Sequence, residues 1–445
     1  MLHRVVKALQ RQEGANDWLA RHIQSSSTQH YVIGHRPESR RSVQCEKVVL
    51  TVMNDHSPTK GGPDPSRGQA EVTVLPGDID VPGRLQESIR RAVFMAGLAD
   101  NPPYGLPGPA EYPSVGLADS ELQDRPREAA ERLVQQLIDA LAGERGVRLS
   151  SAEAFVEQAH TDFRNSRGAD GQQTTTNLLL DWVLLAADGQ DEMESHVAFE
   201  RRRAADLDVP ALVRRYAQYA RDALTASTPK TGTFPVVVSD EALAELLVGA
   251  GYSPLIYRSS AQLKHQRMSM WEAGAPIFDK KPGGDAFTMH SNAVLPFGMR
   301  SVCFDQDGLP GQRLAIVEDG VLTRFWADQR YAEYLGVPVT GAFGNMEVAA
   351  GTHSYASLLE ADSPLYHIVA FSAMTPDALT GDFVGEIRLG YEIEKGHARP
   401  VRGGSVSGNL PDVLAEACLS RETAFLGDYI GPRAMRFAQV TVAGA

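Results

Sequence analysis

Residues 401–414 read VRGGSVSGNLPDVL, and the interpretation of this stretch decides which class of fold the chain is compared with. A run rich in glycine and serine can be a phosphate-binding loop, which requires the pattern GxxxxGK[ST]. Gly403 and Gly408 have the spacing of that pattern, but Asn409 and Leu410 stand in place of its lysine and its serine or threonine. The GxGxxG spacing of a dinucleotide-binding loop is absent as well. The stretch therefore argues against a nucleotide enzyme.

The same stretch fits a strand that ends in a tight turn and leads into a short helix. We expect positive φ angles at Gly408 and Asn409, because both residue types tolerate the left-handed region of backbone space. A short helix is expected to begin near Pro411, since proline is favoured in a first helical turn.

The C-terminal half of the chain has the sequence texture of a β protein. Residues 301–326 and 382–408 consist of short β-like runs that are separated by glycine and aspartate turns. In the second segment, Glu394–Gly396 lies between two alternating runs, which predicts a hairpin.

The N-terminal half mixes strand and helix signals. Strand patterns at 47–53 and 70–75 flank a long link rich in glycine and proline, which predicts a hairpin with a flexible tip. Apolar residues at helical spacing predict amphipathic helices at 127–142 and 209–224, the second capped by Asp208. The remaining predictions are a helix at 84–98, irregular proline-rich structure at 101–114, and strands at 177–187 and 196–203.

These patterns together predict an α+β fold. An N-terminal sheet-and-helix domain, residues 1–228, is expected to precede a C-terminal antiparallel β-dominated domain, residues 232–445. Residues 225–233 have the composition of a linker between the two.

Composition and charge exclude several classes of protein. The net charge of −13 gives no electrostatic footprint for nucleic acid, so direct DNA or RNA contact is not expected. Three widely spaced cysteines, Cys45, Cys303 and Cys418, support neither a disulfide framework nor a zinc site built from cysteines. The sequence has no signal-peptide pattern at its start and no apolar run long enough to span a membrane. We expect a soluble, cytoplasmic protein.

The quoted stretch also carries a family resemblance. SVSGNLPDVL, with the closing MRFAQVTVAGA, resembles the C-terminal signature of the TldD/PmbA family, in particular its PmbA (TldE) branch. The resemblance covers roughly residues 150–445, whereas residues 1–118 diverge and are shorter than in the family. Other similar segments follow in the family's order: Asn165–Gly168, Asp206–Leu207, Phe234–Val238, residues 304–336 and Thr340–Gly341.

The resemblance implies a link to zinc peptidases. TldD-type members are zinc metallopeptidases with HExxxH on a helix and a cysteine ligand near the C-terminus, usually paired with a PmbA-type partner that lacks these ligands. In the corresponding helix, residues 241–251 contain Glu241 and Glu245 but no histidine, and residues 427–437 contain no cysteine. Cys418 is expected in a helix, as a buried apolar residue. We therefore assign no catalytic, cofactor-binding or metal-binding residue, and expect zinc only in a TldD-like partner.

A replacement site would have to come from residues elsewhere. His265, Glu272 and His290 form the most suggestive set among the 12 histidines, but their spacing fits no standard metal pattern. Three neighbours of His265 are expected to pack rather than to bind copper: Met268, Met270 and Trp271.

Nucleophilic and acid–base signals are weaker still. The chain has no GxSxG elbow, and His353 and Ser354 are adjacent, a spacing that rarely lets two side chains face each other. Two acidic pairs are explained by turn chemistry without catalysis: Asp305 with Asp307, and Glu318 with Asp319.

Three hypotheses about function follow. The first is a non-catalytic, PmbA/TldE-like subunit of a zinc metallopeptidase that processes a peptide, paired with a TldD-like subunit or with a second copy of itself. The second is an autonomous family member in a natural-product pathway with a non-standard active site. The third is a non-enzymatic interaction protein, as the family's other label, modulator of DNA gyrase, implies.

Overall fold

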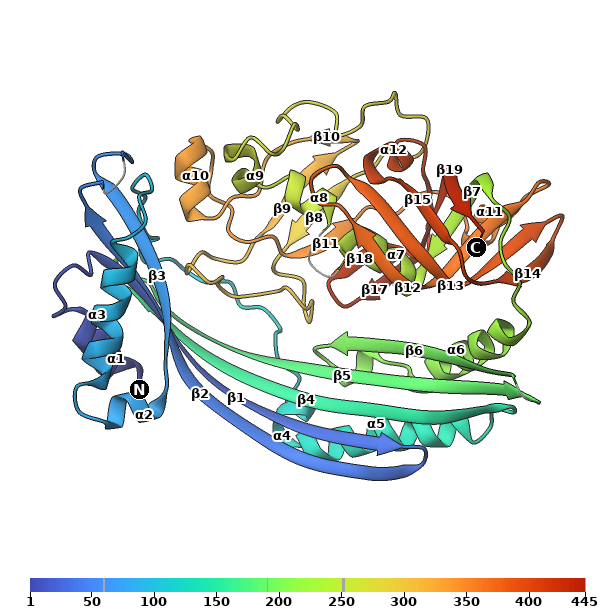
Figure 1. Cartoon of the computed structure of the whole chain (residues 1–445), viewed down its shortest axis with the longest axis horizontal. Helices are drawn as coiled ribbons and strands as arrows, with labels where there is room; N and C mark the ends of the chain where they lie inside the picture. Colours follow the sequence, from blue (N-terminus) through green and yellow to red (C-terminus); the bar gives the residue numbers. More distant parts are fainter. Residues whose placement is uncertain (59–60, 190, 250–252, 445) are drawn as a thin grey trace.

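The computed structural model describes residues 1–58, 61–189, 191–249 and 253–444. Helices and mostly antiparallel strands confirm the predicted α+β class. The described strands form one six-stranded sheet before residue 202 and two further sheets, of six and seven strands, after residue 231. Figure 1 shows the C-terminal half above the concave side of the long N-terminal strands. A division into two domains between residues 228 and 232 stays a prediction.

The N-terminal sheet is antiparallel, with the strand order β3-β2-β1-β4-β5-β6. The predicted hairpin is confirmed, since Val48 pairs with Val74. Both of its strands run further toward the tip than predicted, so the connection shortens to residues 57–65, of which 59–60 lie outside the described residues. The strands are β1 (Asp17–Ile33), β2 (Arg36–His56), β3 (Ser66–Val74), β4 (Val147–Asn165), β5 (Asp170–Asp188) and β6 (Asp191–Arg201).

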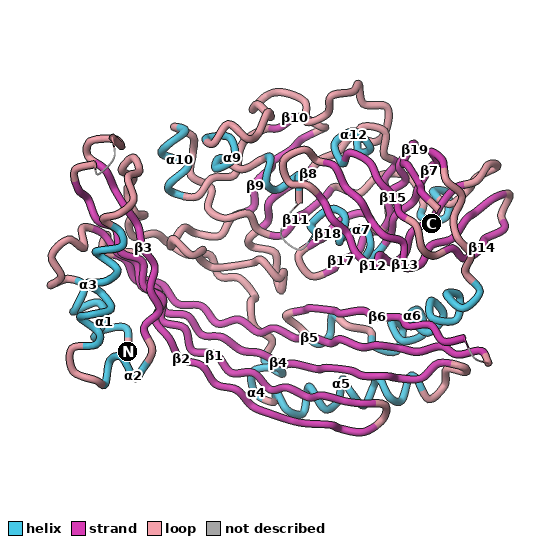
Figure 2. Tube along the Cα trace, in the orientation of Figure 1, coloured by secondary structure: helices cyan, strands magenta, loops and turns pink. Residues whose placement is uncertain are grey.

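The two central strands of this sheet, β1 and β4, are not among the strands predicted from the sequence. The middle of β1 reads QSSSTQ at residues 24–29, so it lacks the apolar–polar alternation of a half-buried strand. The predicted strands 177–187 and 196–203 lie largely within the longer β5 and β6. Figure 2 shows how far these strands extend across the molecule.

Helices bury the apolar face of the N-terminal sheet. The predicted helices are confirmed as α5 (Pro126–Leu141) and α6 (Val209–Thr225), which pack beside each other on β4, β5 and β6. The carboxylate of Asp208 caps α6, as predicted, by accepting a hydrogen bond from the N–H of Ala211. The other described helices of this half are α1 (Leu2–Leu9), α2 (Pro76–Asp80), α3 (Arg84–Ala96), α4 (Ser120–Asp124) and the 3₁₀ turn Ala204–Asp206.

The C-terminal half is built on two sheets. One has the order β10-β9-β8-β11-β18-β17, and the other β12-β7-β19-β15-β13-β14. Because β12 also pairs with β13, five strands of the second sheet close into a small barrel. The strands are β7 (Gly232–Ser239), β8 (Met289–Asn292), β9 (Arg313–Glu318), β10 (Val321–Leu322), β11 (Asn345–Val348), β12 (Leu365–Pro376), β13 (Asp382–Glu394), β14 (His397–Val401), β15 (Ser405–Asn409), β16 (Cys418–Leu419), β17 (Thr423–Leu426), β18 (Tyr429–Pro432) and β19 (Ala434–Ala443).

Short helices fill the spaces around these sheets. They are α7 (Asp240–Val248), α8 (Pro254–Arg258), α9 (Ala261–His265), α10 (Gln329–Leu335), α11 (Tyr355–Leu358) and α12 (Leu410–Leu414). Nowhere in the described ranges does a helix combine the length and apolar character needed to cross a membrane.

The glycine-rich stretch forms a strand and a helix, as predicted, but its turn lies elsewhere. Gly408 lies inside β15, paired with Phe383, and Asn409 has a φ of −106°. The expected positive φ angles at these two residues are therefore wrong. Gly403 and Gly404 have them instead, at 72° and 69°, because the chain must reverse before β15 begins.

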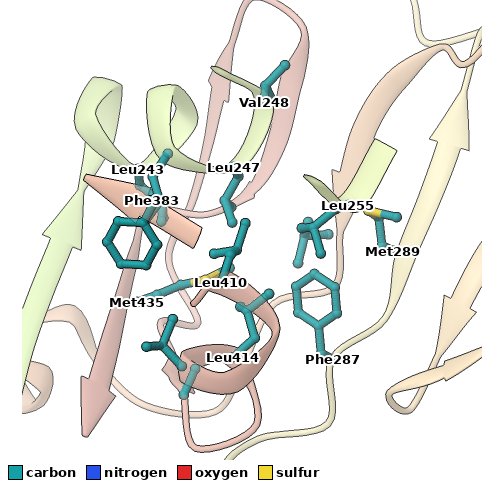
Figure 3. Packing of buried hydrophobic residues seen from close by; sticks show 14 of the residues in the cluster. Leu243, Leu247, Val248, Leu255, Phe287, Met289, Phe383, Leu410, Leu414 and Met435 are labelled. Carbon is teal, nitrogen blue, oxygen red and sulfur yellow. The ribbon is translucent and has the colours of Figure 1, made fainter. Parts of the chain in front are cut away.

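The helix that follows this stretch is anchored in the largest core. Figure 3 shows Leu410 and Leu414 of α12 directed into the same apolar cluster as Leu247 of α7, with Phe287 and Met435 beside them. The side chain of Asn409 caps α12. A proline in the first turn and leucines one turn apart thus explain why this segment folds as a helix on the core.

Three further local predictions concern a hairpin, a linker and a helix. The hairpin at Glu394–Gly396 is confirmed, with Glu394 paired to His397 and positive φ angles at both turn residues. The linker at 225–233 is shorter than predicted, since β7 begins at Gly232. The helix expected around Cys418 is wrong: Cys418 lies in β16, which pairs with β19.

One buried arginine ties the two halves of the chain together. Arg202 donates hydrogen bonds from its guanidinium to the carbonyl oxygens of Gly298 at 2.8 Å, Met299 at 2.8 Å and Ser301 at 3.1 Å. A further, longer bond of 3.4 Å reaches the carbonyl of Leu117. Burial lowers the pKa of Arg202 to about 10, which leaves it charged at neutral pH.

Candidate functional site

Helix α7 occupies the position at which the resemblance implies metallopeptidase chemistry. Arg215 of α6 lies 3.2 Å from the carboxylate of Glu241 and 3.9 Å from that of Asp240. Burial raises the pKa of Glu241, and Arg215 opposes that shift. Glu245 lies one turn further on and is exposed. Residues 250 and 251 of the segment 241–251 lie outside the described residues.

A buried polar cluster precedes this helix. The hydroxyl of Ser239 lies 2.9 Å from Nε2 of His367, and the hydroxyl of Tyr355 lies 3.2 Å from the same nitrogen. Burial lowers the pKa of His367 to about 4, so its imidazole is neutral at pH 7. The pair has the composition of a nucleophile and its base. Ser239 has no exposed surface, however, so the contact stabilises the core rather than reaching a substrate.

No local sequence pattern pairs Ser239 with His367, because β7 and β12 lie far apart along the chain. The residue after Ser239 is Asp240, whose φ of 52° is unusual for a residue other than glycine. The guanidinium of Arg433 holds this residue, with Nε 2.8 Å from one of its carboxylate oxygens.

A cavity of about 250 Å³ lies between the N-terminal sheet and the C-terminal half. We call it the interface cavity. Strands β1, β2 and β3 form one wall, and the turn at 306–307 with the start of α10 forms the other. Its lining residues are Leu19, Arg21, Thr51, Met53, Gln69, Glu71, Tyr104, Leu106, Gln262, Gln306, Asp307, Asp328, Gln329, Arg330 and Tyr331.

The acidic pair at residues 305 and 307 has two different roles at this cavity. Asp305 accepts hydrogen bonds from the backbone N–H groups of Asp307, Leu309 and Ala342, each at 3.0 Å. This is the turn chemistry that was predicted. Asp307 lines the cavity, where burial and the neighbouring charges of Asp305 and Asp328 raise its pKa to about 7.

Two arginines of the interface cavity have an incomplete set of partners. Nη2 of Arg21 lies 3.4 Å from the carboxylate of Glu71, and Nη2 of Arg330 donates to the side-chain oxygen of Asn101 at 2.8 Å. The Nε atom of each arginine is buried and, among the described residues, has no hydrogen-bond partner. The ring of Tyr104 lies 5.7 Å from the guanidinium of Arg330. The cavity therefore presents positive and negative groups to the same small space.

The suggested metal set His265, Glu272 and His290 is not assembled. His265 packs on the rings of Tyr331 and Tyr334, and Glu272 forms an ion pair with Lys264. His290 lies in β8 opposite Glu347, and burial lowers its pKa. Across the described ranges, no group of three or more histidine, cysteine, aspartate or glutamate residues could hold a metal ion.

The remaining candidates have structural roles of their own. Nε2 of His353 lies 3.7 Å from Asp285, whereas the hydroxyl of Ser354 caps α11, so the two side chains act separately. Asp319 lies in the β9–β10 turn, as predicted, and Glu318 is the last residue of β9, paired with Val321 across that turn. Trp271 is buried as expected, but Met268 and Met270 are exposed, so the expectation that they pack is wrong.

Comparison with known proteins points to one family. Residues 231–444 match the family described as PmbA/TldA metallopeptidase C-terminal domain. The metalloprotease PmbA of Escherichia coli O157:H7 is 27% identical over 330 residues, which are 68% of this chain and 69% of that protein. A zinc metalloprotease TldD homolog of Saccharolobus solfataricus is 22% identical over 288 residues, 60% of this chain and 62% of that protein.

The fold as a whole has a solved counterpart. The crystal structure of TldE from Thermococcus kodakarensis matches all of this chain and all of that one, with a TM-score of 0.82 at 18% sequence identity. At 18% sequence identity, this match supports a shared fold and nothing further. It includes residues 1–118, which the family resemblance in the sequence does not cover.

Proposed function

Because the chain belongs to the TldD/PmbA family, a group of metallopeptidase-like proteins, we propose that it is a TldE-like subunit of a zinc peptidase complex. In this proposal it acts in peptide processing together with a TldD-like subunit that holds the zinc. The chain itself contributes no zinc ligand.

The composition and contacts of α7 carry this proposal. A zinc peptidase of the HExxxH type needs two histidines on one face of a helix and a glutamate as general base. Helix α7 has Glu241 and Glu245, and the sequence has no histidine between residues 197 and 264. Arg215 already neutralises Glu241, and a guanidinium at 3.2 Å would repel a divalent cation. These residues do not fit a zinc ion.

A subunit without a metal can still contribute to peptide processing through its shape. Strand β17 lies at one edge of the first C-terminal sheet, where an extended peptide could add as a further strand. At the other edge, residues 274–277 already form backbone hydrogen bonds with the segment that contains β10. An obligate pair of subunits would bury at least about 2,000 Å² in total. The subunit would then act by enclosing and aligning the peptide beside the partner's metal.

The test combines assembly, metal content and activity. The chain is purified alone and together with an HExxxH-bearing relative from the same genome, and both samples are analysed by native mass spectrometry and zinc determination. We expect a one-to-one complex with one zinc per pair. Cleavage of fluorescein-labelled casein should require both chains, and it should be lost when the HExxxH glutamate of the partner is changed to glutamine.

A variant of this chain is the matched control. Glu245→Gln removes an exposed carboxylate from α7 and should leave cleavage by the pair within about twofold of the unmodified complex, since such a surface change is nearly neutral. Peptide cleavage by this chain alone, or a stoichiometric zinc ion bound to it alone, would contradict the proposal.

A further inference from the structure

A second cavity lies within the C-terminal half. Its volume is about 350 Å³, which falls in the usual range of small-ligand sites. We call it the apolar cavity. Its walls come from the loop before β8, the segment after β10 and the residues after α10. Its lining residues are Ala273, Thr323, Arg324, Phe325, Val337, Pro338 and Thr340.

The uncharged polar side chains of this lining already have partners. The hydroxyl of Thr323 donates to the carbonyl oxygen of Ala315 at 2.9 Å, and the hydroxyl of Thr340 accepts from the N–H of Ala327 at 2.7 Å. The other lining side chains, apart from that of Arg324, are apolar. A polar ligand would find few partners here, whereas an apolar side chain would leave water on entering the cavity.

The backbone beside the cavity has an unpaired position between two paired ones. Leu322 donates to the carbonyl of Ala275 at 3.0 Å and accepts from the N–H of Gly274 at 2.7 Å. Trp326 is bonded in the same two ways by residues 259 and 261. Arg324, midway between them, takes part in no hydrogen bond within the described part of the chain. Its N–H and C=O are therefore free to pair with the backbone of another chain.

Arg324 also supplies the charge of the apolar cavity. It is exposed, and within the described ranges its guanidinium forms no ion pair. A long charged side chain keeps its head in water, so we expect this charge at the solvent side of the cavity. The planar fork of a guanidinium matches the two oxygens of a carboxylate.

We propose that the apolar cavity binds the C-terminal end of an apolar peptide. The last side chain of the peptide enters the cavity, its backbone pairs with the N–H and C=O of Arg324, and its carboxylate lies at the Arg324 guanidinium. The neighbouring positions Leu322 and Trp326 are already paired, so a chain end fits here and a longer added strand does not. This role is separate from the proposed subunit function, because the binding requires no partner chain.

Titration calorimetry on the purified full chain tests this assignment. The probes are N-acetyl-dialanyl-phenylalanine, its C-terminal amide, N-acetyl-dialanyl-serine and 3-phenylpropanoate. We expect saturable binding of the first probe and binding about tenfold weaker or less for each of the others. The amide lacks the carboxylate, the serine peptide lacks the apolar side chain, and 3-phenylpropanoate lacks the peptide backbone.

Variants then locate the site. Arg324→Gln should weaken binding of the phenylalanine peptide about tenfold and that of its amide less than twofold, since only the first has a carboxylate. Ala273→Trp fills the apolar cavity and should weaken both about tenfold or more. Arg214→Gln is the matched control, because Arg214 is exposed on α6 and has no ion pair within the described residues. It should change the affinity less than twofold.

Three results would overturn the proposal. The first is no saturable binding of the phenylalanine peptide below about 10 mM, an affinity too weak for a specific site. The second is equal or tighter binding of any of the three comparison probes. The third is unchanged affinity in the Arg324→Gln or the Ala273→Trp variant, once thermal unfolding shows that the variant is folded. None of these depends on whether the chain has a peptidase partner.

Discussion

The guanidinium of Arg215 lies 3.2 Å from the carboxylate of Glu241 and links α6 of the N-terminal half to α7 of the C-terminal half. Both side chains are largely buried, with 29% and 23% of their surface exposed. The contact therefore has two consequences. It stabilises the packing of the two halves, and it neutralises the carboxylate that the family resemblance would otherwise suggest as a general base.

Removing Arg215 should destabilise the protein through Glu241. Arg215→Met leaves the buried carboxylate without its partner, and we expect the free energy of unfolding in urea to fall by about 1–3 kcal/mol. The double variant Arg215→Met/Glu241→Gln should regain part of the loss, since it removes the unpaired charge as well. Equal stability of the single and double variants would show that the pair is not coupled.

Arg202 should contribute more than its neighbour to holding the two halves together. Arg202→Met leaves several buried carbonyl oxygens without a donor, and we expect unfolding to become easier by about 3 kcal/mol. Arg203 is half-buried, pairs with Asp206 within one turn and lies 4.5 Å over the ring of Phe297, so Arg203→Gln should cost only about 1 kcal/mol. Urea titration followed by tryptophan fluorescence compares the two, and similar losses would contradict the assigned roles.

The stability of the protein should depend on the ionisation of Asp307. Its folded-state pKa of about 7 exceeds the ordinary value of 3.8, so ionisation opposes folding. The penalty is absent below pH 3.8, grows between pH 4 and 7 and is complete above pH 7. The pKa of about 7 already includes the effects of the nearby charged groups: Asp305 and Asp328 raise the pKa of Asp307, and Arg21 lowers it. Asp307→Asn should therefore stabilise the protein at pH 8, by up to about 4 kcal/mol, and hardly at all at pH 4.

An aspartate shifted in the opposite direction is the control for this pH experiment. Backbone N–H groups of Thr380 and Leu379 hold the pKa of Asp377 below its usual value. Asp377→Asn should therefore weaken the fold slightly at pH 8 and not at pH 3. If Asp307→Asn also destabilises at pH 8, the raised pKa of Asp307 is wrong.

The Ser239–His367 contact should matter for stability and not for chemistry. Ser239→Ala removes the hydroxyl that lies 2.9 Å from the buried imidazole, and we expect a loss of about 1–2 kcal/mol in unfolding free energy. Peptide cleavage by the complex with a TldD-like partner should not change once both samples are fully folded. A large loss of cleavage without a loss of stability would identify Ser239 as part of an active site.

The two glycines at the start of the quoted stretch should respond differently to alanine. A Cβ at Gly404 would lie 2.0 Å from the carbonyl oxygen of Ala443, whereas a Cβ at Gly403 would meet nothing within 4 Å. Both have positive φ, so Gly403→Ala should cost about 1 kcal/mol. Gly404→Ala adds a clash with backbone and should cost about 2–4 kcal/mol. Thermal unfolding of both variants measures the difference, and equal losses would contradict the close approach of β15 and β19.

The candidate site could be predicted from the sequence only in part. The turn pattern in the sequence singled out Asp305 and Asp307, and it correctly predicted that Asp305 stabilises its turn by accepting backbone hydrogen bonds. The importance of Asp307 depends on its burial against β1, which no local pattern reports. The expected metal set failed because spacing along the chain says nothing about the partners that His265 and Glu272 find in space.

The sequence by itself determined the elements whose signals are local. Proline, glycine and apolar periodicity sufficed for α5, α6 and the β13–β14 hairpin, because caps, turns and helical faces depend on residues a few positions apart. Only the tertiary structure decided the central strands β1 and β4 and the interface cavity. Their polar residues are ordered by pairing across the sheet and by the packing of the C-terminal half, and contacts between residues far apart in the chain cannot be predicted from a local pattern.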